Sequence, residues 1–141
     1  MKIAVINGPN LNMLGKREKD HYGSFSLKEL EKYLQKQIKT ENLIFFQSNH
    51  EGQIVDFIQN LVNEEVNGII INAGALTHTS IAVRDALLSV KIPFVEVHIS
   101  NVYAREDFRQ KSYLSDIADG VIAGMGMPVY RLALEYFKET L

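Results

Sequence analysis

The sequence predicts an α/β domain built on a parallel five-stranded sheet, and three observations support this prediction. Short apolar runs alternate along the chain with segments of helical periodicity, as in parallel sheets whose strands are joined by helices. The run at 68–72 is apolar without alternation, which is typical of a strand covered on both faces. The chain has 141 residues, enough for one core and too few for two, so we expect a single domain spanning 1–141.

The expected elements follow one another in a simple order. Strands are predicted at 2–6, 43–47, 68–72, 94–97 and 120–123, and helices at about 27–40, at 52–66, from Thr79 or Ser80 to 90, and at 127–139. Ser26 and Glu29 fit a capping box at the start of the first helix. In the second helix the residues expected to face inward are Ile54, Phe57, Ile58, Leu61 and Val62. The pattern indicates a flavodoxin-like three-layer sandwich with strand order 2-1-3-4-5 and helices on both faces.

Polar residues gather where these strands are expected to end. Asn7 and Asn10 follow the first strand, Asn72 and His78 the third, and Glu96, His98, Ser100 and Asn101 the end of the fourth. The carboxyl ends of parallel strands share one edge of the sheet, where such folds bind ligands at the point of strand-order reversal. The sequence therefore predicts one shared site between the first and third strands.

Composition excludes several classes of protein. The net charge is −2 and the basic residues form no stripe, which argues against a nucleic-acid partner. The chain has no cysteine, which excludes disulfides, thiolate chemistry and cysteine-ligated zinc. It begins directly with strand-like residues, and no apolar run reaches the ~20 residues of a membrane helix. We expect a soluble cytoplasmic protein with no membrane partner.

Three familiar functions of this fold lack their motifs. A phospho-acceptor domain needs acidic residues where Asn7 and Asn72 stand. A flavin phosphate loop needs clustered hydroxyl residues, which 8–12 does not supply. Val129 occupies the place of the third glycine that a dinucleotide fingerprint starting at Gly124 would require.

The segment 8–25 has neither helical nor strand periodicity and is rich in glycine and asparagine, so we interpret it as an active-site loop or lid. It carries Arg17 and Tyr22. A tyrosine titrates near ~10 and serves as a base only if its phenolate is stabilised. A guanidinium ~4 Å away, at an effective dielectric constant of ~20, contributes about 4 kcal/mol, equivalent to roughly three pKa units. The alternative is that Tyr22 only packs the loop against the body of the protein.

Glu96 and His98 are two residues apart on a predicted strand, so their side chains share a face. A carboxylate beside an imidazole fixes its tautomer and supports its cationic form, as general acid–base catalysis requires. A purely structural pair at a strand end is the alternative. A metal site formed by His78, Glu96 and His98 is a further possibility.

The segment 72–80 combines an amide, small residues and a hydroxyl-capped helix start. Its backbone amides would suit an anionic substrate group. The alternative is an ordinary connection between a strand and a helix, with a good N-terminal helix cap. Arg109 could clamp an oxyanion or be solvated. Asp85 lies one turn into the following helix, too far along to face the same crevice.

Taken together, these segments resemble the type II 3-dehydroquinate dehydratases over nearly the whole chain. The motifs are Gly8-Pro9-Asn10-Leu11-Asn12 with Leu14-Gly15, Arg17-Glu18 and Tyr22-Gly23; Asn72-Ala73-Gly74-Ala75 with Thr77-His78-Thr79-Ser80; Glu96-Val97-His98-Ile99-Ser100-Asn101; and Ala104-Arg105-Glu106 with Phe108-Arg109. Four motifs in the right order are far more specific than any one of them. Lys19 stands where the family usually has proline, and Leu76 replaces a residue that is often aromatic.

The resemblance implies the conversion of 3-dehydroquinate to 3-dehydroshikimate, the third step of the shikimate pathway toward chorismate and the aromatic amino acids. It implies an anti elimination of water without a Schiff base, a cofactor or a metal. Tyr22 would take the proton at C2 and Arg17 would keep Tyr22 deprotonated. Asn10, through a water, would hold the developing enolate. His98, oriented by Glu96, would protonate the departing hydroxyl at C1.

The resemblance also assigns substrate-binding residues and an assembly. Asn72 and the backbone of Ile99 and Ser100 would bind the substrate carboxylate, while His78 and Arg109 would hold the ring hydroxyls. Asp85 would reach the site of a neighbouring subunit, in a homododecamer built as a tetramer of trimers. Two other hypotheses remain at this stage: a non-catalytic module that binds a small anion, and a metal-assisted hydrolase at His78, Glu96 and His98.

Overall fold

The computed structural model describes residues 1–16 and 24–141, and within them the five expected strands form one parallel sheet. The strands are β1 (Ile3–Asn7), β2 (Leu43–Gln47), β3 (Gly68–Asn72), β4 (Phe94–His98) and β5 (Gly120–Ala123). Their order is β2-β1-β3-β4-β5, which confirms the predicted flavodoxin-like arrangement. Because β1 and β3 are paired in register, Asn7 lies beside Asn72 at the carboxyl edge.

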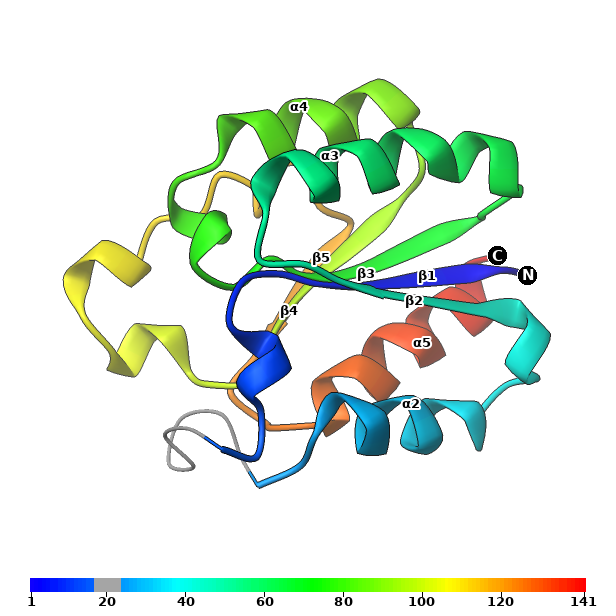
Figure 1. Cartoon of the computed structure of the whole chain (residues 1–141), viewed down its shortest axis with the longest axis horizontal. Helices are drawn as coiled ribbons and strands as arrows, with labels where there is room; N and C mark the ends of the chain where they lie inside the picture. The colour runs from blue at the N-terminus through cyan, green and yellow to red at the C-terminus, as the bar shows by residue number, and fades with distance from the viewer. Residues whose placement is uncertain (17–23) are drawn as a thin grey trace.

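Within residues 1–16 and 24–141, four α-helices cover the two faces of this sheet. They are α2 (Leu27–Gln35), α3 (Glu51–Asn60), α4 (Ile81–Val90) and α5 (Pro128–Thr140). Figure 1 shows α3 and α4 on one face and α2 and α5 on the other, with the carboxyl ends of the strands and their loops at the left. Among the residues that the structure describes, no helix is long and apolar enough to cross a bilayer.

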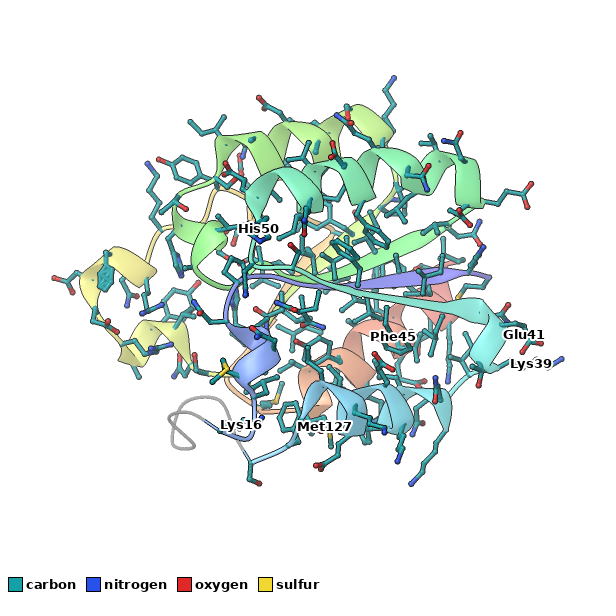
Figure 2. All side chains as sticks on the ribbon, viewed as in Figure 1. Lys16, Lys39, Glu41, Phe45, His50 and Met127 are labelled. Atoms are coloured by element: carbon teal, nitrogen blue, oxygen red, sulfur yellow. The ribbon has the colours of Figure 1, made fainter. Side chains whose placement is uncertain are left out.

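Alternation along each strand divides the core into two clusters. Ile3 and Val5 point to the cluster under α2 and α5, whereas Ala4 and Ile6 point to the cluster under α3 and α4. In Figure 2, Phe45 and Met127 lie on the α2 and α5 side and His50 lies at the start of α3. By the same alternation, Asn7 and Asn72 belong to the α2 and α5 side, and Glu96 and His98 belong to the other.

Two helices end earlier than the periodicity predicts. The helix predicted at 27–40 stops at Gln35, although Ile38 still packs on the core from the following turn. The helix predicted at 52–66 stops at Asn60 and continues as a 3₁₀ turn, Leu61–Glu64, which Glu65 closes with a φ of 57°. The inward position predicted for Val62 was wrong, because its side chain is 55% exposed. Apolar spacing reports burial, and a turn can bury a side chain as well as a helix does.

Two helices begin directly after serines that the sequence predicted as N-terminal caps. Ser26 Oγ accepts a hydrogen bond from the Glu29 amide at 3.1 Å, and Ser80 Oγ accepts one from the Val83 amide at 2.9 Å. Of the two predicted caps of α4, Ser80 is therefore the one used. The hydroxyl of Thr79 instead donates to the Ala75 carbonyl at 3.4 Å.

The loops that follow β1 and β3 touch each other closely. The Gly8 amide donates to the Asn72 carbonyl at 2.8 Å, and a Cβ at position 8 would lie 2.3 Å from the Ala73 carbonyl oxygen. Only a glycine allows this approach. The contact holds the start of the predicted active-site loop against the end of β3.

Candidate active site

A cavity of about 90 Å³ lies at the carboxyl edge of the sheet, where the loops after β1, β3 and β4 meet. It is lined by Pro9, Asn10, Leu11, Asn72, Gly74, Ala75, His78, His98, Ile99, Ser100, Val102, Arg105 and Arg109. The predicted site residues among them are Asn10, Asn72, His78, His98, Ile99, Ser100 and Arg109. The structure therefore brings together residues from three separate segments, as the strand-end pattern predicted.

The remaining predicted residues lie elsewhere. Glu96 is buried directly behind His98 and contacts it. Asp85 is exposed on α4 and does not line this cavity. Arg17 and Tyr22, with the middle of the predicted loop 8–25, lie outside the described residues, so their roles stay predictions.

Glu96 and His98 form a buried hydrogen-bonded pair on the last residues of β4. The Oε2 of Glu96 contacts the Nε2 of His98, and the two side chains are 1% and 7% exposed. Because a carboxylate can only accept, Nε2 carries a proton, which leaves Nδ1 as the ring nitrogen free for a substrate. Burial opposes ionisation of Glu96, but its hydrogen bonds from His98, Ser115 and Ser112 outweigh burial and hold its pKa below the usual range.

His78 approaches the same cavity from the turn after β3. Its Nδ1 donates to the Lys111 carbonyl at 2.7 Å, and its ring centre is 6.4 Å from that of His98. Burial lowers the pKa of His78, and the nearby charges of His98 and Arg109 act in the same direction, against the opposing Lys111 hydrogen bond. A neutral His78 with its proton on Nδ1 presents Nε2 as an acceptor, which suits a substrate hydroxyl.

Asn72 is fixed by a buried hydrogen-bond chain that crosses the sheet edge. Its Nδ2 donates to the Tyr130 hydroxyl at 3.0 Å, and that hydroxyl donates to Asn7 Oδ1 at 2.5 Å. Its Oδ1 accepts from the Gly74 amide at 3.2 Å. Burial raises the pKa of Tyr130, so its phenol stays neutral and keeps donating. The amide that lines the cavity therefore has a set orientation.

Asn10 is held at the cavity by its backbone. It has a φ of 71°, in the left-handed region that asparagine tolerates better than most residues. Its amide donates to Asn49 Oδ1 at 2.9 Å, which ties the loop after β1 to the loop after β2. The backbone of Asn10 is thus anchored at the rim of the cavity that this residue lines.

Two arginines give the cavity a positive wall. Arg109 Nε donates to Glu106 Oε1 at 3.0 Å, and Arg105 Nη1 lies 3.5 Å from Ser100 Oγ. Arg105 was missed as a site residue by sequence reasoning, which named it only within the motif Ala104-Arg105-Glu106. The sequence feature that could have identified it is its position shortly after the polar residues at the end of β4. The guanidinium groups suit an anionic substrate.

No cluster of three histidine or carboxylate side chains suited to a metal ion occurs within residues 1–16 and 24–141. His78 and His98 each already use one ring nitrogen for a protein hydrogen bond. The arrangement offers a proton-transfer pair, a neutral histidine and an anion-binding wall.

The fold and this site define a flavodoxin-like α/β protein whose strand-end cavity is equipped for acid–base chemistry on a small anion. The chain belongs to the class II dehydroquinase family, because the family's sequence model, described as "Dehydroquinase class II", matches residues 1–138.

Individual relatives agree with this assignment. The chain is 57% identical to a 3-dehydroquinate dehydratase of Prochlorococcus marinus subsp. pastoris, over 100% of this chain and 97% of the relative. It is 58% identical to one from Endomicrobium trichonymphae, over 94% of each. The solved type II dehydroquinase of Butyrivibrio crossotus superposes with a TM-score of 0.94 at 47% identity, covering 98% of this chain and 97% of that one. The family model and these relatives each cover nearly the whole chain.

Proposed function

We propose that this chain dehydrates 3-dehydroquinate to 3-dehydroshikimate, as a hydro-lyase of the shikimate pathway. The observation that carries the proposal is the buried Glu96–His98 pair opening into a cavity with a positive wall, in a chain of the class II dehydroquinase family. The elimination of water changes no oxidation state overall, so the chemistry needs acid, base and charge stabilisation.

In this proposal the proton at C2, next to the ketone, moves to Tyr22, which Arg17 keeps deprotonated. The electron pair left on carbon forms an enolate, which Asn10 stabilises through a water. Collapse of the enolate breaks the C1–oxygen bond, and His98 gives its Nδ1 proton to the departing hydroxyl. Glu96 accepts the hydrogen bond from Nε2, so its carboxylate balances the charge of a His98 ring that carries protons on both nitrogens before this transfer.

The same proposal assigns binding of the substrate to the remaining lining residues. The substrate carboxylate is held by Asn72 and the backbone amides of Ile99 and Ser100. The ring hydroxyls are held by Arg109 and by His78, whose lowered pKa keeps Nε2 available as an acceptor. Arg105, whose Nη1 lies 3.5 Å from Ser100 Oγ, adds positive charge near the proposed carboxylate position.

Assembly belongs to the proposal as well. Asp85 is exposed on α4, away from the cavity of its own chain, which is compatible with a role at a neighbouring subunit. We propose a homododecamer, a tetramer of trimers, located in the cytoplasm.

The direct test is an absorbance assay for the enone of 3-dehydroshikimate after addition of 3-dehydroquinate. Tyr22→Phe should lower kcat at least about a hundredfold and leave substrate binding intact, because only the proton acceptor is lost. Tyr136→Phe removes an exposed phenol whose partner is Asp119 and serves as the control. Absence of product at every pH would favour an anion-binding module without catalysis, and near-normal turnover of Tyr22→Phe would remove Tyr22 as the base.

A further inference from the structure

The carboxylate of Glu96 has a second set of partners on the side away from His98. Ser112 Oγ donates to Glu96 Oε1 at 2.9 Å, and Ser115 Oγ donates to the same oxygen at 2.7 Å. Both serines come from the segment between β4 and β5 and line a second cavity of about 120 Å³ behind His98. Neither lines the cavity assigned to the substrate.

The direction of the Ser112 hydrogen bond is fixed by its other partners. Its oxygen accepts from the backbone amides of Leu114 and Ser115, both at 3.0 Å. A hydroxyl oxygen has two acceptor positions and one proton. With both acceptor positions occupied, the proton of Ser112 must point to Glu96 Oε1.

This geometry restricts where Glu96 can hold a proton. An oxygen that already receives two O–H donors has no room for a proton of its own. A proton shared by the pair is therefore confined to the line between Glu96 Oε2 and His98 Nε2. Both carboxylate oxygens of Glu96 then have hydrogen-bond partners: the two serines contact Oε1, and the imidazole contacts Oε2.

We propose that Ser112 and Ser115 are positioning residues that keep Glu96 Oε1 unprotonated and direct its Oε2 to His98. The proposal rests on the proposed function for its catalytic consequence and on the hydrogen-bond geometry alone for its structural part. The serines touch no substrate and act through Glu96. Through Glu96 they hold the His98 ring in the orientation in which Nδ1 faces the leaving hydroxyl.

Ser115 is the better position to test, because its hydroxyl makes only the bond to Glu96 among the interactions described, whereas Ser112 also supports a turn. Ser115→Ala should lower kcat about tenfold, the effect typical of losing an outer hydrogen-bond partner of a functional histidine in metal sites. KM should change less than about twofold, because proton donation by His98 develops in the transition state. Ser115→Thr keeps a hydroxyl and should recover most of the loss.

Ser89→Ala is the matched control. This substitution also removes one hydroxyl hydrogen bond, from Ser89 to the Ala86 carbonyl on α4, and Ser89 does not contact Glu96. Unchanged kcat in Ser115→Ala would overturn the proposal, and so would an equal loss of kcat in Ser89→Ala or in Ser115→Thr.

A spectroscopic measurement separates this proposal from the proposed function. The chain has four histidines, so a sample labelled with ¹⁵N-histidine gives few imidazole signals. In the unliganded protein, Ser115→Ala should shift the His98 Nε2 signal and leave the His50 signal in place. This result is expected whether or not 3-dehydroquinate is turned over. An unshifted His98 signal would overturn the proposal even in an active enzyme.

Glu96→Gln gives an independent outcome if Ser115→Ala does not fold. The serine donors should take the amide oxygen and turn the NH₂ group to His98. His98 would then present Nε2 as an acceptor and carry its proton on Nδ1, a tautomer that the ¹⁵N shifts distinguish. An unchanged tautomer in Glu96→Gln would show that the serines do not set the orientation.

Discussion

Tyr130 illustrates how a single buried hydroxyl can organise a site to which it does not belong. It comes from α5, yet it joins Asn7 and Asn72 at the ends of two neighbouring strands. Its side chain is fully buried, and those of Asn7 and Asn72 are only 3% and 4% exposed, so loss of the hydroxyl would leave buried amide atoms without this partner.

Tyr130→Phe should therefore lower the free energy of unfolding by about 1–3 kcal/mol, because two buried amides lose a partner. It should also raise KM, since Asn72 would lose its fixed orientation. Denaturant unfolding and steady-state kinetics measure the two effects. Tyr136→Phe, at an exposed position, should change neither by a comparable amount. A fully stable Tyr130→Phe would mean that the amides find other partners.

His78 should make the stability of the protein dependent on pH. Burial lowers its pKa in the folded state below the ordinary 6.5, so the unfolded chain takes up its proton first as the pH falls. The stabilisation is complete above about pH 6.5 and is lost progressively as the pH falls toward the folded-state pKa. Below that value the loss levels off.

Wild type and His78→Gln should therefore diverge in unfolding free energy below about pH 6.5, with the wild type losing more. His50→Gln, at an exposed position, is the control and should track the wild type. Parallel curves for wild type and His78→Gln would contradict the burial argument.

At the scale of elements, the approach of the loops after β1 and β3 is the tightest constraint described. Gly8→Ala would place a Cβ 2.3 Å from the Ala73 carbonyl oxygen, a contact that only backbone movement relieves. We expect a loss of about 3 kcal/mol in unfolding free energy and a large loss of activity, because Asn10 moves with the loop. Gly52→Ala on α3 meets no atom within 4 Å and should stabilise the helix by up to about 1 kcal/mol. Thermal unfolding of the pair checks the sign of each effect.

Sequence periodicity predicted these elements well because each strand and helix carries its own local pattern. The Glu96–His98 pair was predictable for the same reason, since residues two apart on a strand must share a face. The partners of Glu96 were not, because Ser112 and Ser115 lie 16 and 19 residues further on, in an irregular segment. The role of Tyr130 was not predictable from the sequence either, because its asparagine partners are 58 and 123 residues away in the chain. Helix ends were misplaced where a turn continued the burial of apolar residues.

At the scale of the whole molecule, the position of Asp85 raises the question of whether a neighbouring subunit contributes to the proposed site. It is exposed on α4 and lies outside the cavity of its own chain. If a neighbouring subunit supplies it, Asp85→Ala should raise KM while leaving unfolding of the single chain nearly unchanged. Asp56→Ala, on the exposed side of α3, is the matched control.

A mixing experiment tests this sharing directly. Inactive His98→Asn and impaired Asp85→Ala chains, unfolded and refolded together, should recover part of the activity. Each Asp85→Ala chain would keep its own His98 and receive Asp85 from a His98→Asn neighbour. The absence of any recovery in mixed assemblies of normal size would confine each site to one chain.

The division of the core by the sheet has a consequence for how this family can change over time. Asn72, which we propose to bind the substrate carboxylate, is anchored on the α2 and α5 side of the sheet, and the Glu96–His98 pair lies on the α3 and α4 side. We therefore expect substitutions in one hydrophobic layer to affect one of these two groups more than the other. Substrate affinity and turnover can then change through separate sets of substitutions, because the sheet separates the two hydrophobic layers.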